Sequence, residues 1–484
     1  MLRACFSIAV ALLVLTGTVS AQVNATGTLI GTVTDKSGAV VPNASVKIAN
    51  TDTGAARDGQ TNDSGQYRFD LLPVGAYDVR IQAAGFGAAV FQKVGISVSQ
   101  TATVDANLSP SSQTEVITVE SVGAPLVDTE KTDVSLPIST REIQDLPLNG
   151  RDFVNLAYLA PGARPVNSYD PTKNRIGVFA VDGSSGRNVN VTVNGIDDKD
   201  NTVGGPVMQL PLEAVQEFQI STQRFSAANG RSEGALITAI TKSGTNHFHG
   251  SLYFFDRNQA MNANDYFDKQ ANNPKPDYGR QQFGGSIGGP VRKDKDFLFF
   301  SLERERESTS IAVNPAAYSE LTLAKQAGFA AQPATSIPTP YFDWRYSGRY
   351  DHRFNEHNNL SLSYSNQNNN GLNDQSNSQN DLTAGNFTTN QLILASANLS
   401  SVITPSIVNS ATVGYQYWNN LIDSNIRANN YNFGQNEQLG TNVNVPQQSF
   451  QKKWQFKDDL SITRGKHNFK VGFDYLWEPV LGGF

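Results

Sequence analysis

The sequence contains very little cysteine. Its one thiol, Cys5, lies in an apolar run of about twelve residues, 4–15, that is followed by small residues ending in Ala21. Such a run is too short to span a bilayer and is typical of a cleaved signal peptide, which we predict at residues 1–21. A mature chain cut after Ala21 has no disulfide and no cysteine ligand for a metal.

Long apolar runs and a strong net charge are also missing. No segment after the leader offers the ~18 consecutive apolar residues that a transmembrane helix needs, so we expect any membrane insertion to use β-strands. The 38 Lys and Arg residues against 44 Asp and Glu give a formal charge of −6. This balance gives no electrostatic reason to expect a nucleic-acid partner.

Sequence signatures of catalysis are missing as well. The chain has no GxSxG motif, no phosphate-binding loop and no GxGxxG motif after a strand. Its histidines fall at expected strand ends and turns, without ligand-type spacing to acids; they are His247, His249, His352, His357 and His467. We therefore expect no enzymatic activity, no catalytic residues, no metal and no cofactor.

Aromatic residues are abundant by contrast. The 484 residues include 16 Tyr and 26 Phe, in a chain that is also rich in Asn, Gln, Ser and Gly. Bacterial outer-membrane barrels have this composition, because aromatic girdles line both lipid interfaces and long polar loops join the strands. A large secreted repeat protein would share it, so composition alone does not decide between them.

Residues 27–110 predict a small β-sandwich. Short alternating strands follow Asp- and Gly-containing turns in the segments GTVTDKSGAVVPNASV, TNDSGQYRF and LPVGAYDVRI. The acids Asp35, Asp63 and Asp78 lie at turns or alternate with core residues, which favours a structural role. The three segments resemble the carboxypeptidase-regulatory-like domain, a prealbumin-like sandwich classed with carbohydrate-binding-like folds. Carbohydrate binding is implied only by that fold class.

Residues 121–245 predict a mixed α+β domain. A capping box at Ser139 and Glu142 begins a short helix that ends at Pro147, and a second helix is expected at residues 153–159. Strands are expected at 178–181, 189–193, 217–220 and 236–242, with Asn194-Gly195 as a tight turn and a small-residue loop at 226–235. The last of these strands is apolar or hydroxylated on both faces, so we expect both of its faces to be covered.

Three segments of this domain occur in an informative order. They are LPLNGRDFVNLAYLAPG, VTVNGIDD and the stretch 210–246, in which a Pro-led helical turn, a strand, a loop and a strand ending in Thr-Lys-Ser-Gly follow each other. They resemble the plug domain of TonB-dependent outer-membrane receptors, especially Oar-like receptors. The resemblance implies energy-coupled import of a solute through a plugged barrel, with TonB and outer-membrane lipid as partners and the N-terminal domain in the periplasm.

A linker at residues 111–120 separates the expected sandwich from the plug. It contains Glu115, Val116, Ile117, Thr118 and Val119, a β-prone run in a polar neighbourhood. By resemblance this run is a TonB box, which adds as a strand to a sheet edge of TonB; a short extended segment is sufficient for such pairing. The alternative is the first strand of the plug itself.

An acidic run in the plug is a second candidate site. Asp197, Asp198, Asp200 and Asn201 could bind substrate at the plug apex, but their spacing does not fit a calcium loop. A solvated turn without a ligand is the favoured interpretation.

Residues 246–484 predict part of an antiparallel transmembrane β-barrel. Tight turns near 355–358 and 464–466 alternate with long loops such as 367–386, an asymmetry typical of outer-membrane barrels. Aromatic residues at 415–418 fit an interface girdle. Strands are expected at 250–255, 282–287, 297–306, 341–353, 359–365, 388–402, 407–417, 454–463 and 467–477.

Receptors of this kind close a barrel of about 22 strands, so we expect the sequence to be the N-terminal part of a longer receptor. The transported solute stays open among a small solute, an oligosaccharide and a peptide. Two other functions agree less well with the sequence. A surface adhesin or glycan-binding protein would have no use for a plug or TonB box, and an enzyme subunit related to carboxypeptidases would lack metal ligands.

Overall fold

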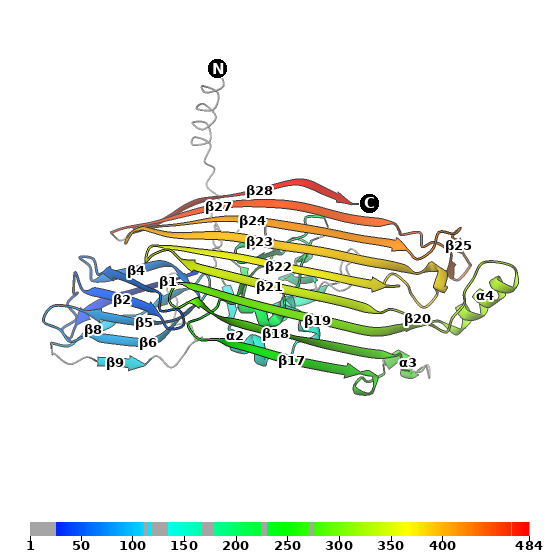
Figure 1. Ribbon diagram of the computed structural model, residues 1–484, viewed down its shortest axis with the longest axis horizontal. Helices are drawn as coiled ribbons and strands as arrows, with labels where there is room; N and C mark the ends of the chain where they lie inside the picture. Colours follow the sequence, from blue (N-terminus) through cyan, green and yellow to red (C-terminus); the bar gives the residue numbers. More distant parts are fainter. Residues whose placement is uncertain are drawn as a thin grey trace, which may run out of the picture.

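The computed structural model describes residues 26–110, 115–118, 134–166, 178–202, 204–223, 230–264, 266–270, 275–465 and 467–483. These residues form a β-sandwich, a small mixed unit and a large antiparallel sheet, and the mixed unit lies against one face of that sheet (Figure 1). The chain is mainly β, as the sequence predicts. The expected signal peptide at 1–21 lies outside the described residues.

The sandwich is built from two sheets that enclose one core. In the first sheet β1 (Thr26–Asp35) pairs with β4 (Gln66–Pro73), β7 (Thr101–Thr103) and β8 (Ala106–Leu108). The second sheet has the order β3 (Ala56–Gln60), β2 (Ser45–Asn50), β5 (Gly75–Gln82), β6 (Ala89–Ile96) and β9 (Glu115–Thr118). Alternate residues of these strands, such as Leu29, Val46 and Val79, are fully buried between the sheets.

The mixed unit, called the plug below, has a central sheet with buried strands. Its order is β10 (Val134–Ile138), β15 (Val215–Gln223), β16 (Leu236–Thr241), β13 (Asn190–Val193) and β14 (Ile196–Asp197), beside a separate pair of β11 (Ala163–Val166) and β12 (Val178–Val181). All six residues of β16 are buried, which confirms that both of its faces are covered.

Short helices connect the plug strands. Helix α2 (Thr140–Asp145) begins at Ser139, and the expected capping box with Glu142 is present. The expected second helix is a 3₁₀ helix, η2 (Phe153–Leu159), preceded by η1 (Asn149–Arg151). The Pro-led turn is η4 (Leu212–Ala214). Within the described ranges, no helix has both the length and the apolar character needed to cross a membrane.

The large sheet, called the barrel sheet below, contains all nine expected strands, most of them longer than expected. They are β17 (His249–Asn258), β18 (Tyr278–Arg292), β19 (Asp296–Ala312), β21 (Tyr341–Arg353), β22 (Asn358–Leu372), β23 (Asn386–Thr404), β24 (Ile407–Ser424), β27 (Gln447–Arg464) and β28 (His467–Gly483), with β20 (Ser336–Pro338) added to β19. Because β22 runs to Leu372, the loop expected at 367–386 is shorter and spans 373–385.

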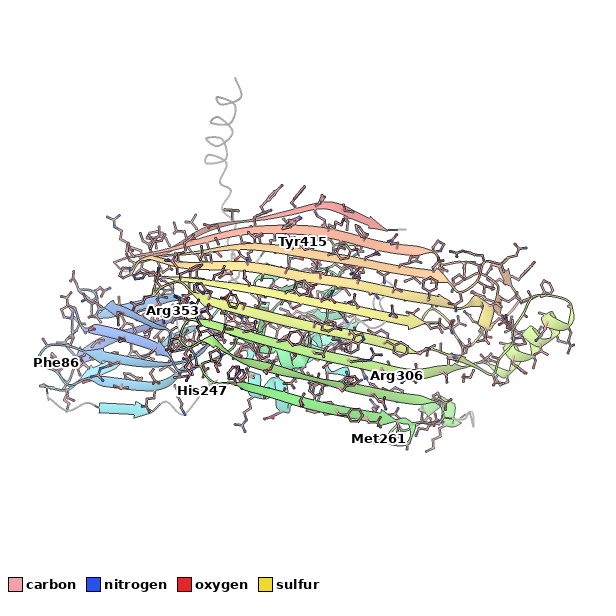
Figure 2. The ribbon with its side chains drawn as sticks, in the orientation of Figure 1. Phe86, His247, Met261, Arg306, Arg353 and Tyr415 are labelled. Carbon is pink, nitrogen blue, oxygen red and sulfur yellow. The ribbon has the colours of Figure 1, made fainter. Side chains whose placement is uncertain are left out.

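Connections differ at the two ends of the barrel sheet. At one end the turns are short, as at 293–295, 354–357 and 405–406. The other end carries α3 (Tyr266–Gln270), α4 (Pro315–Gln326), η5 (Gln259–Met261), η6 (Leu382–Ala384), β25 (Tyr431–Asn432) and β26 (Gln438–Leu439). Arg353 marks the short-turn end next to the sandwich, and Met261 lies at the opposite end (Figure 2).

The two faces of the barrel sheet have opposite polarity. Along β21 the buried face bears Asp343, Arg345 and Ser347, whereas Trp344 and Tyr346 alternate with them on the other face. This polar-in, apolar-out alternation is that of outer-membrane barrels. The same alternation corrects the expected girdle at 415–418, because Trp418 is 1% exposed and packs in the plug core.

Candidate functional site

A tight hairpin turn in the plug brings acidic residues to the barrel wall. Asn194 and Gly195 have φ values of 50° and 81°, which suits the Asn-Gly pair in the turn between β13 and β14. Asp197, which ends β14, accepts hydrogen bonds from Lys453 Nζ at 2.7 Å and from Arg231 Nη1 at 2.7 Å. Lys453 belongs to β27, so this contact joins plug and barrel.

The remaining residues of the acidic run contact the same part of the wall. Gln451 Nε2 donates to Asp200 Oδ1 at 2.5 Å, and Asn201 Nδ2 donates to Glu478 Oε2 at 2.7 Å. The expectation of a solvated turn is wrong, because Asp198 and Asp200 are both 0% exposed. The partners of Asp200 and Asn201 belong to β27 and β28, which lie more than 200 positions away in the sequence. We call Asp197, Asp198, Asp200 and Asn201 with Lys453 the acidic lock.

Asp197 and Asp198 are adjacent and buried, but their pKa values are shifted in opposite directions. Burial raises the pKa of Asp197, but the charges of Lys453 and Arg231 outweigh it and leave that pKa below its ordinary value. Burial, and then the charge of Asp197, raises the pKa of Asp198 well above its ordinary range. The lock therefore places an ionised carboxylate opposite Lys453, beside a carboxyl group that favours its proton.

A second ionic cluster joins the plug to strands β19 and β21. Arg345 Nη1 lies 3.0 Å from Glu303 Oε1, and Arg345 Nη2 lies 3.0 Å from Asp152 Oδ1 of the plug. Arg151 Nη2 lies 3.3 Å from Glu213 Oε1, and its guanidinium carbon is 4.3 Å from the Tyr253 ring centre. Burial raises the pKa of Asp152 to about 6 despite the opposing charge of Arg345.

Sequence reasoning missed this ionic cluster, although a signal was present. Glu303, Glu305 and Glu307 recur at every second position of β19, and all three face the buried side. A strand that turns a row of carboxylates to one face needs cations opposite it. The Arg-Asp pair at 151–152 lies within LPLNGRDFVNLAYLAPG, one of the three segments that resemble a plug domain.

The candidate TonB box lies beside the sandwich. Glu115, Val116, Ile117 and Thr118 form β9, which pairs in parallel with β6 in the register Ala89↔Glu115 to Gln92↔Thr118. Val119 lies outside the described residues. The alternative of a first plug strand is wrong for these residues, because β9 belongs to a sandwich sheet and the described plug sheet begins at β10.

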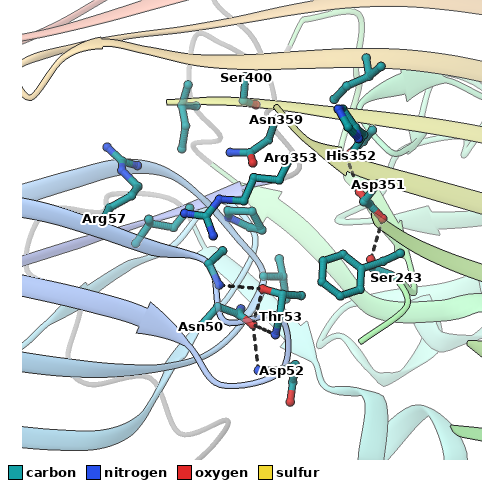
Figure 3. A pocket seen from close by; sticks show the side chains of 18 of the residues that line it. Asn50, Asp52, Thr53, Arg57, Ser243, Asp351, His352, Arg353, Asn359 and Ser400 are labelled. Carbon is teal, nitrogen blue, oxygen red and sulfur yellow. Dashed lines mark hydrogen bonds between the residues drawn. The ribbon is translucent and has the colours of Figure 1, made fainter. Parts of the chain in front are cut away.

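The sandwich contacts the plug and the short-turn end of the barrel sheet. Val98 N donates to Glu217 Oε1 of the plug at 2.9 Å, and Asn246 N donates to Asp52 O at 2.9 Å. A cavity of about 180 Å³ lies between the three units. Arg57 and Arg353 line it together with Asp351, which accepts a hydrogen bond from Ser243 Oγ at 2.6 Å (Figure 3).

Two family models match the chain. Residues 28–109 match the carboxypeptidase regulatory-like domain, and residues 240–343 and 311–480 match the outer membrane beta barrel domain. The barrel match indicates an outer-membrane location, in agreement with the sequence expectation.

Relatives and solved structures agree with these matches. The chain is 30% identical over 299 residues to the TonB-dependent transporter Oar of Myxococcus xanthus, over 58% of this chain and 27% of the relative. The outer membrane transporter YddB from Escherichia coli has the same fold at 12% identity, with a TM-score of 0.54 over 71% of this chain and 48% of that chain. The chain spans about a quarter of the length of Oar and about half that of YddB. The chain thus combines an N-terminal carboxypeptidase regulatory-like domain with an outer membrane beta barrel domain, and it is similar to the TonB-dependent transporter Oar.

Proposed function

We propose that this chain provides the sandwich, the plug and part of the barrel wall of a TonB-dependent transporter that takes up a solute without covalent chemistry. The observation that carries the proposal is the position of the plug on the polar face of the barrel sheet, held by buried ion pairs such as Asp197–Lys453. An adhesin would not need such a plug. The similarity to Oar supports the same function.

The difference between the two ends of the barrel sheet indicates how the chain is oriented in the outer membrane. Outer-membrane barrels have short turns on the periplasmic side and longer loops outside. The sandwich contacts the short-turn end (Figure 1). The sandwich and the segment 115–119 are then periplasmic, where the inner-membrane partner TonB can reach them.

TonB binding at Glu115, Val116, Ile117, Thr118 and Val119 would pull on the plug through its first strand. The first described strand after this segment is β10, which lies at the edge of the plug sheet and pairs only with β15 there. An edge strand of five residues can be peeled off one hydrogen-bonded pair at a time, without breaking the buried centre at β16. Pulling would therefore loosen the plug from its edge.

The acidic lock is assigned to holding the plug. Asp197, Asp198 and Asp200 are covered by the barrel wall and partnered within the protein, so a solute has no direct access to them. Asn201 is partly exposed and remains the member of the run that a bound solute can contact. A small solute, an oligosaccharide and a peptide are the classes to be compared in uptake.

Binding of TonB tests this proposal. We expect the purified chain to bind the C-terminal domain of TonB, and we expect the Ile117→Pro variant to lose at least tenfold in affinity, because proline removes a backbone donor. Ser112→Pro is the matched control, since it places a proline in the same linker outside the segment. Equal affinity of the wild type and the Ile117→Pro variant would refute the assignment of the segment.

A further inference from the structure

We infer that the outer edge of β6 is an intramolecular docking site for Glu115–Thr118, and that the sandwich competes with TonB for this segment. The inference rests on the proposed function, in which TonB binds the same residues. The sandwich is then a clamp that keeps the coupling segment out of use until it is released.

Strand β6, on which the segment docks, is held in the sandwich by contacts that do not involve β9. Phe91, Val94 and Ile96 of β6 are buried in the sandwich core, and β5 pairs with β6 on the inner side. Among the described strands, only β9 covers the outer edge of β6. An open strand edge presents unpaired backbone donors and acceptors, so it is a template for an extended segment.

The docked segment, β9, is short and lies in the sequence between the sandwich and the plug. β9 is a strand of four residues that pairs with Ala89, Val90, Phe91 and Gln92 of β6. A parallel pair of this length contributes few hydrogen bonds, and each is modest in net stability. The pairing is therefore strong enough to order the segment and weak enough for a second strand-binding partner to displace it.

The clamp is itself anchored, which makes its release necessary for coupling. Val98, two residues after the end of β6, donates its N–H to the buried Glu217 of plug strand β15. Asn246 and Arg353 hold the other side of the sandwich through Asp52 O and Ala56 O. While β9 stays on β6, a pull on the segment loads these contacts instead of β10. Coupling therefore requires that β9 leave β6.

Disulfide trapping in the full chain tests this inference. Val90 and Val116 are register partners, and adjacent strands lie about 4.8 Å apart, within the separation that a disulfide spans. The native Cys5 is replaced by Ser in every variant. We expect the Val90→Cys/Val116→Cys chain to form an internal disulfide. The control Gly95→Cys/Val116→Cys is out of register and should form none.

Affinity for the C-terminal domain of TonB is then compared between the oxidised and reduced forms of the in-register variant. We expect oxidation to lower the affinity at least tenfold and reduction to restore it. If no disulfide forms, the docking of β9 on β6 is refuted. If the disulfide forms and affinity is unchanged or higher, competition is refuted while the TonB-binding segment stands. If the reduced form and the wild type both fail to bind TonB, the proposed function fails instead.

Discussion

Removing the cation of the acidic lock should loosen the plug from the barrel wall. Lys453 is 2% exposed and donates to Asp197 Oδ1 and to Lys199 O, both at 2.7 Å. Deleting one member of a buried ion pair costs about 3 to 5 kcal/mol, because the other charge stays buried. Asp197 keeps Arg231 in the Lys453→Met variant, so we take the lower end, about 3 kcal/mol. This corresponds to an equilibrium change of roughly 100-fold.

Amide hydrogen exchange of the β13–β14 hairpin measures this change. The Asp197 N–H donates to Gln455 Oε1 of β27, and its exchange reports local opening of the hairpin. We expect exchange about 100-fold faster in Lys453→Met. Lys452→Met is the matched control, since Lys452 alternates to the other face and lies 5.2 Å from the Phe450 ring centre. Unchanged exchange in Lys453→Met, or equal acceleration in both variants, would refute the lock.

Three further predictions concern the plug and its contacts. Because burial raises the pKa of Asp152 from 3.8 to about 6, the contribution of Asp152 to stability falls as pH rises from about 4 to about 6. In urea unfolding, the free energy of unfolding of Asp152→Asn should therefore rise by about 2 to 3 kcal/mol relative to that of the wild type over this interval. A pH-independent difference between the two would contradict the shift. Trp418→Ala should cost about 3 to 5 kcal/mol by removing a buried ring from the plug core, whereas Tyr415→Ala should cost much less; equal losses in chemical denaturation would reject the assigned faces. Ser139→Ala should lower the free energy of unfolding by about 1 kcal/mol through loss of the α2 cap, and a change below ~0.3 kcal/mol would reject a stabilising cap.

Local patterns in the sequence were sufficient for the elements of the fold. The capping box at Ser139 and the Asn194-Gly195 turn depend on neighbours within a few residues, and both are present. The apolar strand β16 was predicted as covered on both faces because its own residues require it. The barrel strands were underestimated in length, since inward-facing polar residues such as Gln367 interrupt the apolar pattern without ending the strand.

Contacts between distant segments could not be predicted in the same way. The partner of Asp197 is 256 positions away at Lys453, and no local pattern distinguishes a covered acidic turn from a solvated one. The pairing of β9 with β6 depends on backbone donors and acceptors that every residue type except proline carries, so side chains hardly specify it. Glu303, Glu305 and Glu307 were different, because their spacing already implied a charged inner face.

Crosslinking between the segment 115–119 and TonB in living cells tests the central claim most directly. Ile117→Cys is paired with single cysteines introduced along the sheet edge of TonB, in a chain whose Cys5 is replaced by Ser. The proposed transport by plug displacement would require this contact, so we expect a disulfide-linked product at Ile117→Cys and none at the linker control Ser112→Cys. If neither position, or both equally, were crosslinked to TonB, the assignment of this chain to TonB-coupled uptake through residues 115–119 would be contradicted.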